Sequence, residues 1–274
     1  MPVRFPSLDH CSRFFMRLKE NETLPAVVGW AHVVKTSGFS TYNALFPDIR
    51  KRVATYPTLH AANGIGENWA SGCPVSHWHC TPSEMAGCKG ARDARWLTVL
   101  RDPVDRVLSE YYFMRAKRNY LGWTPSMIAK RDNLSAWALD DYNTAHNRQA
   151  FYALYDGAYP LRGTCAPTDA NKTTAFILGK VGSFAAFNRD SAIAAEALRR
   201  CAQLFFFVVI YDARAQSYDR LHHLYRLRAR PTLTTHPSYQ PVAEPSIRAL
   251  IRSRNRLDDA LLQHARKHYL TGNP

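Results

Sequence analysis

Three short apolar runs constrain the fold of this chain more than any other feature of its sequence. The runs are AVVGWAHVV at 26–34, WLTVL at 96–100 and LFFFVVI at 204–210. Each is rich in β-branched or aromatic residues and is bounded by polar residues, which is typical of a buried strand. The sequence therefore predicts at least three strands, separated by long intervening segments.

Helical patterns follow these runs. Residues 42–46 indicate a helix after the first run, and apolar residues recur every three or four positions at 191–203, 217–228 and 247–262. Strands that alternate with helices predict an α/β fold in three layers, with a central parallel sheet covered by helices on both faces. No repeat or long Pro/Gly/Ser linker divides the chain, so we expect a single domain over residues 1–274.

The charge of the chain is strongly positive. Lysine and arginine total 36 and aspartate and glutamate total 22, which gives a formal net charge of +14. Such a surface attracts polyanions. Composition alone leaves nucleotides, nucleic acids, anionic lipids and sulfated glycans as possible partners.

The cysteines and glycosylation sequons point to an oxidising compartment. Six cysteines lie at positions 11, 73, 80, 88, 165 and 201, without a CxxC pair or a zinc-site spacing, so disulfides are favoured and no metal is expected. Cys73 and Cys88 bracket one segment and are candidates for a bridge. Sequons at Asn21, Asn133 and Asn171 indicate passage through a secretory lumen. Residues 1–18 show no signal or membrane-spanning run, so we expect any membrane anchor to lie outside this chain.

The first run leads into a candidate anion-binding loop. The sequence HVVKTSGFST at 32–41 offers backbone N–H groups at a helix start, and Lys35 adds a mobile positive charge. The Walker A pattern of nucleoside triphosphatases is absent from the sequence, which argues against a triphosphate hydrolase. The loop alone is equally compatible with an ordinary turn between a strand and a helix.

The second run leads into another candidate site. The sequence WLTVLRDPVDRVLSEYY at 96–112 predicts a strand that ends near Arg101 and a helix that begins at once, because Asp102 and Pro103 are a favourable N-cap and first-turn pair. Arg101 and Ser109 are candidates to bind one phosphate. The alternative is that Arg101 pairs with a carboxylate and Ser109 only packs.

These strings together resemble the PAPS-dependent glycan sulfotransferases, in particular the heparan sulfate 6-O-, 2-O- and uronyl 2-O-sulfotransferases. The loop at 32–41 and the string LRDPVxRxLSEYY resemble the elements of that family that bind the 5′-phosphosulfate and the 3′-phosphate of PAPS. Further similarity lies in NRQ at 147–149, at 205–224 and at 255–269, so the likeness covers most of the chain. One departure is that Val34 and Ser37 replace the proline and the first glycine of the usual loop.

The resemblance implies a P-loop-like sulfotransferase fold and an O-sulfotransferase that uses PAPS, without a metal. It implies that the 3′-phosphate is held by Arg101 and Ser109. It also implies that the 5′-phosphosulfate is held by Lys35, Thr36, Ser37, Gly38, Phe39, Ser40 and Thr41. Lys35 would in addition stabilise the charge that develops during transfer.

A general base is expected between the two phosphate elements. The sequence SHWHCT at 76–81 resembles the family segment that contains the catalytic histidine, and a histidine has a pKa suited to accept a proton from a sugar hydroxyl. His77 is the preferred base and His79 the second candidate, with Glu84 as a group that could orient it. Two histidines at this spacing could instead hold a water molecule or a metal.

The acceptor is expected to be an anionic polysaccharide in the Golgi lumen, with no nucleic acid partner. Basic and aromatic residues follow the second motif and could contact sugar rings and acidic groups; they are Tyr112, Arg115, Lys117, Arg118, Tyr120, Trp123, Lys130 and Arg131. Asn147, Arg148 and Gln149 could line the same cleft or contact the nucleotide. A solvated helix face is the alternative for each basic residue. A non-catalytic polyanion-binding protein, similar to a lectin, and a phosphate-transferring nucleotide enzyme are the rival functions.

Overall fold

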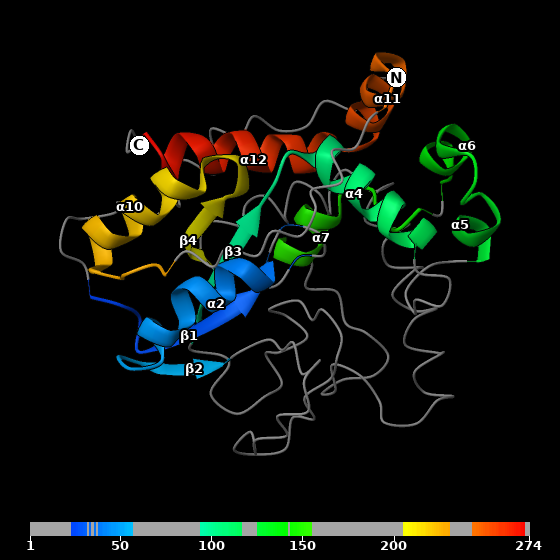
Figure 1. Cartoon of the computed structure of the whole chain (residues 1–274). Coiled ribbons are helices and arrows are strands. Elements are labelled where there is room, and N and C mark those ends of the chain that lie inside the picture. Colours follow the sequence, from blue (N-terminus) through cyan, green and yellow to red (C-terminus); the bar gives the residue numbers. More distant parts are fainter. Residues whose placement is uncertain are drawn as a thin grey trace, which may run out of the picture.

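In the described part of the chain, four parallel strands form the central sheet (Figure 1). The computed structural model describes residues 23–31, 33, 36, 38–56, 94–116, 125–141, 143–154, 205–230 and 243–271. The strands are β1 (Val27–Ala31), β2 (Ala54–Tyr56), β3 (Arg95–Leu100) and β4 (Phe205–Ile210), in the spatial order β2-β1-β3-β4. All three strand pairings are parallel.

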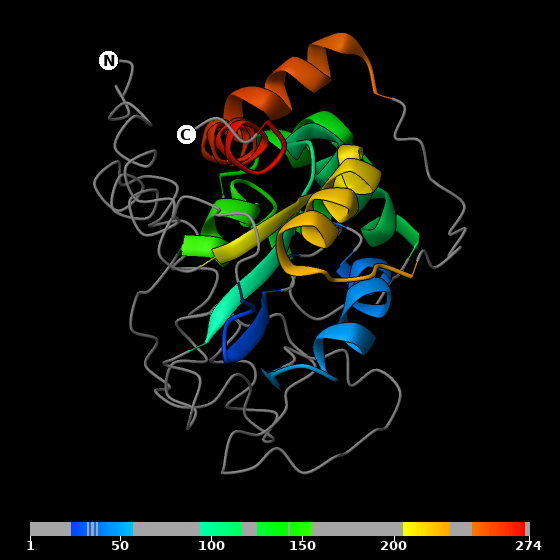
Figure 2. The same cartoon turned by 90° about the vertical axis from the view of Figure 1, so that its left-hand side faces the viewer.

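Helices cover both faces of the sheet. The described helices are α2 (Gly38–Ile49), α4 (Pro103–Ala116), α5 (Pro125–Ala129), α6 (Leu134–Leu139), α7 (Arg148–Leu154), α10 (Arg214–Tyr225), α11 (Pro245–Arg254) and α12 (Arg256–Tyr269), with the 3-10 turn η3 (Tyr211–Ala213). Neighbouring residues of a strand point to opposite faces. The rings of Phe206 and Tyr225 of α10 lie 5.4 Å apart, and those of Phe207 and Tyr269 of α12 lie 5.0 Å apart. Figure 2 accordingly shows α10 and α12 on either side of β4.

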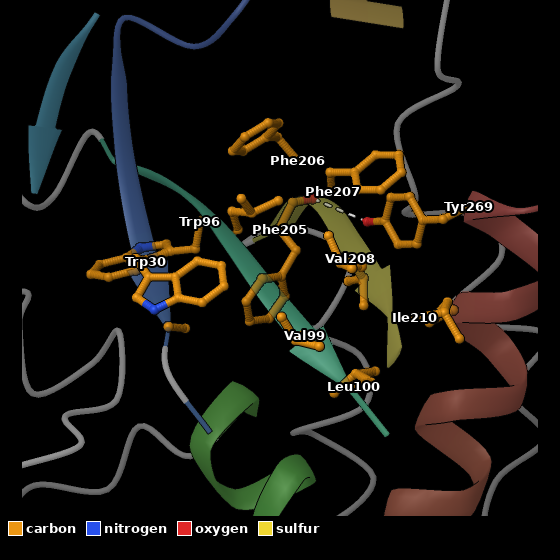
Figure 3. Packing of buried hydrophobic residues seen from close by; sticks show 14 of the residues in the cluster. Trp30, Trp96, Val99, Leu100, Phe205, Phe206, Phe207, Val208, Ile210 and Tyr269 are labelled. Atoms are coloured by element: carbon orange, nitrogen blue, oxygen red, sulfur yellow. Dashed lines mark hydrogen bonds between the residues drawn. The ribbon is translucent and has the colours of Figure 1, made fainter. Parts of the chain in front are cut away.

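The core is built mainly from β3 and β4, which are buried on both faces except at the partly exposed Arg95 (Figure 3). The hydroxyl of Tyr269 donates to the carbonyl of Phe205 at 3.3 Å. On the other side of β3, Trp30, Tyr42 and Phe46 form what we call the β1–α2 aromatic cluster, with the rings of Tyr42 and Phe46 stacked at 4.3 Å.

One glycine is required by a close approach within the sheet. Gly29 of β1 lies opposite Trp96 of β3 in the parallel register. A Cβ atom at position 29 would lie 2.4 Å from the indole ring of Trp96, which is itself fully buried. The β1–β3 contact therefore depends on the absence of a side chain at this position.

The three predicted strands and the α/β class are confirmed, with shifts at the element ends. β1 ends at Ala31, before the predicted end at 34, and α2 begins at Gly38 instead of 42. The apolar spacing at 247–262 spans two helices, because the helix is interrupted at Asn255 between α11 and α12. β2 was not predicted, and the expected helix at 191–203 lies outside the described residues.

Candidate anion-binding site

The order of the strands defines one edge of the sheet as the place for a ligand. β1 has β2 on one side and β3 on the other, so the chain changes direction across the sheet between β1 and β3. In open α/β sheets, ligands bind beyond the carboxyl ends of the strands at such a switch point. The hydroxyl of Thr98 in β3 donates to the carbonyl of Ala31 at 2.7 Å, which fastens the two strand ends together. Both predicted phosphate elements follow these strand ends directly.

On the β1 side, a buried turn precedes the first residue of α2. The hydroxyl of Thr36 donates to the carbonyl of Val33 at 2.9 Å, and both residues are buried. α2 has 12 residues, and its amino end carries the partial positive charge of the helix dipole. Thr41 in its first turns is buried and its Oγ1 accepts from the hydroxyl of Tyr218 at 3.3 Å, while Ser40 is partly buried.

On the β3 side, the predicted cap is confirmed. The carboxylate of Asp102 accepts from the backbone N–H groups of Val104 at 2.9 Å and Asp105 at 3.1 Å, and Pro103 is the first residue of α4. Arg101 therefore stands between the end of β3 and the start of α4, partly exposed. Ser109, also partly exposed, lies six residues beyond Pro103, about 9 Å along the helix axis.

The backbone of Arg101 is held by the side chain of Gln149. The amide Oε1 of Gln149 accepts from the Arg101 N–H at 2.8 Å, and its Nε2 donates to the Arg101 carbonyl at 2.8 Å. Gln149 is fully buried in α7. Two opposed hydrogen bonds to one residue fix both the position and the orientation of its backbone, so α7 positions the arginine at the strand end.

Tyr211 and Arg214 join the site, and the motif analysis had not singled them out. The guanidinium of Arg101 lies 4.5 Å from the centroid of the Tyr211 ring, and that of Arg214 lies 4.6 Å from the same centroid. Asp102, which follows Arg101 in the sequence, pairs with Arg252 at 3.0 Å. Asp212, which follows Tyr211, pairs with Arg266 at 3.1 Å. Two arginines thus lie beside one tyrosine ring at the carboxyl edge of β3 and β4.

A buried ionic network lies behind this edge; it comprises Arg106 and Glu110 of α4, Arg148 of α7 and Asp258 of α12. Glu110 accepts from Arg106 at 2.7 Å and from Arg148 at 2.5 Å, and Arg106 lies 3.8 Å from Asp258. Two cations therefore face two anions in a buried environment. Burial lowers the pKa of Arg106, and the neighbouring Glu110 and Asp258 oppose that shift. Since each charge has an opposite partner, the network is neutral as a whole.

The amino ends of α7 and α12 cap each other. The carboxylate of Asp258 accepts from the N–H groups of Gln149 at 3.2 Å and Ala150 at 2.7 Å. In return, the side chain of Asn147 accepts from the N–H groups of Leu257 at 3.1 Å and Asp258 at 3.4 Å. Asn147 has a positive φ of 47°, which asparagine tolerates better than most residues. Burial raises the pKa of Asp258 to about 6, and Arg106 acts in the opposite direction.

These contacts change the interpretation of the string at 147–149. Asn147, Arg148 and Gln149 were expected to line an acceptor cleft or to touch the nucleotide, but all three are buried and their polar groups bind other parts of the protein. The string at 147–149 and the string at 255–258 meet in the structure. The described contacts of Asn147 and Gln149 therefore position α12 and Arg101.

The other predicted residues fall into two groups. Arg115 is exposed near the end of α4, with its guanidinium 5.9 Å from the centroid of the Tyr111 ring. Asn133 of the second sequon is exposed and caps α6 by accepting from the N–H of Ala136 at 2.9 Å. The following lie outside the described residues or have no described side chain: Asn21, Lys35, Ser37, Gly38, Phe39, His77, His79, Glu84, Lys117, Arg118, Tyr120, Trp123, Asn171 and all six cysteines.

Comparisons with known proteins add no relative. Neither the known protein-family models nor the curated proteins give a match to this chain. Within the described ranges, no group of histidine, cysteine, aspartate or glutamate side chains is arranged to hold a metal ion. The helices described for the chain are each too short or too polar to cross a membrane. The assignment of a function therefore depends on the sequence motifs and on the geometry of the sheet edge.

Proposed function

We propose that this chain is a PAPS-dependent carbohydrate O-sulfotransferase with a P-loop-like sulfotransferase fold. The observation that supports the proposal most is the adjacency of β1 and β3 in a parallel sheet with its switch point between them. This topology brings the helix start at Gly38 and the arginine after β3 to the same edge. Two anion-binding elements 60 or more residues apart in the sequence can thus bind one ligand that has two anionic ends.

The residues at this edge suit the chemistry of PAPS, which supplies the sulfuryl group and has an anion at each end of its sugar. The amino end of α2 and Lys35 offer N–H groups and a cation for the 5′-phosphosulfate. Arg101 and Ser109 bind the 3′-phosphate, and Arg214 adds a second guanidinium through its place beside Tyr211. The residues Thr36, Ser37, Gly38, Phe39, Ser40 and Thr41 complete the cradle.

Transfer requires one proton acceptor and one positive charge. His77, or in the second alternative His79, accepts the proton of the sugar hydroxyl while the hydroxyl oxygen forms a bond to sulfur. The bond between sulfur and the phosphate oxygen breaks in line with the new bond, and its electrons remain on the phosphate oxygen. Lys35 stabilises the charge that develops there.

The acceptor side of the proposal rests on charge and on the family resemblance. Arg115, Arg118, Tyr120 and Trp123 provide cations and aromatic faces for an anionic polysaccharide. The net charge of +14 favours such a partner. The exposed sequon at Asn133 is compatible with a protein that is active in the Golgi lumen.

Thermal stabilisation by PAP tests the donor site. A ligand that binds only the folded state raises the Tm. PAP should therefore raise the Tm of the wild-type protein, whereas ATP with magnesium, for which we propose no site, should not. Arg101→Gln should reduce the PAP shift strongly, whereas Arg256→Gln, an exposed arginine on α12, should keep it. The absence of any PAP shift in the wild-type protein would refute the sulfotransferase assignment.

Turnover tests the base and separates an enzyme from a polyanion-binding protein. His77→Ala should keep the PAP shift and lose transfer of labelled sulfate from PAPS to heparan-type chains. If His79→Ala alone abolishes transfer, the roles of the two histidines are exchanged. A PAP shift without transfer to any anionic polysaccharide would favour a non-catalytic binding protein.

A further inference from the structure

A second basic surface lies at the opposite edge of the sheet from the candidate anion-binding site. Helices that follow parallel strands run back along the sheet, so α2 and α10 both end at this rear edge. We call it the rear basic surface; it comprises the exposed residues Arg50, Lys51, Arg52, Arg226, Arg228 and Arg230. α2 has 12 residues, so the surface lies about 18 Å from the helix start at the anion site.

Hydrogen bonds between the two helix ends hold these residues in one place. The guanidinium of Arg52 donates to the carbonyl of Tyr225, the last residue of α10, at 2.8 Å. The backbone N–H of Arg228 donates to the carboxylate of Asp48 at 3.0 Å, and that of Arg230 donates to the carbonyl of Ala44 at 2.9 Å. The segment at 226–230 therefore runs along the second half of α2, and the six cations form one surface.

Among the described residues, the rear basic surface carries many more positive than negative charges. Among the described residues that form it or bond to it, Asp48 is the carboxylate that takes part, through its contact with the Arg228 backbone. Six exposed cations are thus described here beside one partly buried carboxylate. Like charges held together on a folded surface repel one another, so the arrangement favours a partner that brings several negative charges.

The chemistry of the surface favours an acidic polysaccharide over nucleic acid or membrane. Five of its six cations are arginines, whose forked N–H groups match sulfate and carboxylate oxygens. No exposed Phe, Tyr or Trp is described on the rear basic surface. The nearby ring of Tyr42 is stacked on Phe46, and its hydroxyl is bonded to Arg50. Single-stranded nucleic acids are bound by stacking on such rings, and membrane-surface helices insert apolar side chains.

We propose that the rear basic surface is a second binding site for an acidic polysaccharide, which holds a remote part of the chain whose hydroxyl is sulfated at the other edge. The choice of a polysaccharide rests on the proposed function, whereas the surface itself does not. A polymer is long enough to contact both edges, but a nucleotide is not. The surface would therefore make the affinity of the protein depend on the length of the acceptor chain.

A pair of substitutions tests this site without loss of the contacts that hold the segment. Arg228 and Arg230 bond to α2 through their backbone N–H groups, so Arg228→Gln with Arg230→Gln should fold with an unchanged Tm. The matched control replaces two exposed cations of α12, Arg256→Gln with Lys267→Gln, and has the same net charge. The probe is a long heparin oligosaccharide, with a short one and a single-stranded DNA of equal charge as comparisons.

The rear variant should bind the long oligosaccharide about tenfold more weakly than the wild-type protein, with a reduced salt dependence, because two ionic contacts are lost. The control should stay within about twofold. Equal loss in both variants, or equal binding by the rear variant and the wild-type protein, would overturn the proposal. DNA bound more tightly than heparin, and lost in the rear variant, would overturn it in favour of a nucleic acid.

The PAP shift separates this proposal from the proposed function. The rear variant should keep the PAP shift of the wild-type protein, since the two edges are far apart. If the wild-type protein shows no PAP shift and the rear variant still loses heparin affinity, the sulfotransferase assignment fails and the rear site stands. If PAP stabilises all three proteins and heparin binding is the same in all three, the rear site fails alone.

Discussion

The region of β1 and α2 is held by apolar and aromatic contacts, whereas the region of α4, α7 and α12 adds buried charges and amides to its apolar contacts. In the first, Trp30, Tyr42 and Phe46 pack against each other and against the sheet. In the second, Arg106, Glu110 and their partners form the buried ionic network. Apolar contacts are not directional, but hydrogen bonds to buried groups are.

The difference explains how one arginine can be positioned at the end of β3. Arg101 is bonded through its backbone to Gln149, and Gln149 is bonded through its N–H to Asp258 of the ionic network. A shift of α7 or α12 would therefore be transmitted to Arg101 in the candidate anion-binding site. On the β1 side, the rings of Tyr42 and Phe46 of α2 pack on Trp30 of β1.

Removal of Glu110 should have the largest effect. Glu110→Ala leaves Arg106 and Arg148 buried without their shared carboxylate, and the loss of one partner from a buried ion pair costs about 3–5 kcal/mol. Unfolding in urea measures this loss. The control Glu244→Ala, at an exposed position, should stay within about 0.5 kcal/mol. A loss below about 1 kcal/mol for Glu110→Ala would show that the network does not hold this region.

A methyl group at the β1–β3 contact should have the next largest effect. Gly29→Ala places its Cβ against the Trp96 ring, and we expect a loss of about 3 kcal/mol in the free energy of unfolding, the upper end for overpacking. The same substitution in a Trp96→Leu background should cost much less, because the contact is then removed. An equal cost in both backgrounds would mean that the apolar region does not depend on this close approach.

Local signals predicted the strands and one cap, and contacts between distant residues account for what was missed. The buried strands were found because β3 and β4 are continuous apolar runs, and Asp102 with Pro103 signals a helix start within two residues. β2 was missed because three residues give no periodicity. The mutual capping of α7 and α12 joins residues such as Asn147 and Asn255, which lie 108 positions apart, so no local pattern reveals it.

The candidate site shows the same contrast between local sequence signals and contacts between distant residues. Arg101 was predicted because it directly follows a strand, and by that rule Tyr211 and Arg214 after β4 could also have been found. The string at 147–149 was noticed for its polar residues but was placed in a cleft. The burial of this string depends on α12, and no sequence pattern indicates that α12 packs against α7. Sequence reasoning thus located the edge of the sheet, but not the groups that support it.

Acidification should destabilise the polar region through His146. This histidine is buried, its Nε2 lies 3.0 Å from the carbonyl of Ala138, and Nδ1 lies 3.3 Å from the amide of Asn255. Burial lowers the pKa of His146 to about 4, and Arg254 and Arg106 add to the shift, which Asp140 opposes. A histidine whose pKa is lower in the folded state stabilises it above pH 6.5, and this contribution is lost as the pH falls toward 4.

The measurement compares the wild-type protein with His146→Gln at two pH values. Between pH 7 and pH 5, the wild-type protein should lose about 2 kcal/mol that the variant does not lose. Asp258, with its pKa raised to about 6, acts in the opposite sense in both proteins and cancels in the difference. His223→Gln, at an exposed position of α10, controls for the loss of an imidazole. An identical change in both variants would exclude His146 as the source.

The smallest expected effect concerns the cap next to Arg101. Asp102→Ala removes the acceptor for the N–H groups of Val104 and Asp105, and loss of such a cap costs about 1 kcal/mol. Asp105→Ala, in the same helical turn, removes an ion pair with Arg248 but no cap, so about 0.5 kcal/mol is expected.

The two aspartate variants should differ more in PAP binding than in stability. The cap fixes the start of α4 directly after Arg101, so Asp102→Ala allows that residue to move, whereas Asp105→Ala leaves the strand end unchanged. We expect a smaller PAP shift in Asp102→Ala and an unchanged one in Asp105→Ala, with urea unfolding measured on both. Equal PAP shifts in the two variants would mean that Gln149 alone positions Arg101, because its two hydrogen bonds to that residue remain in both.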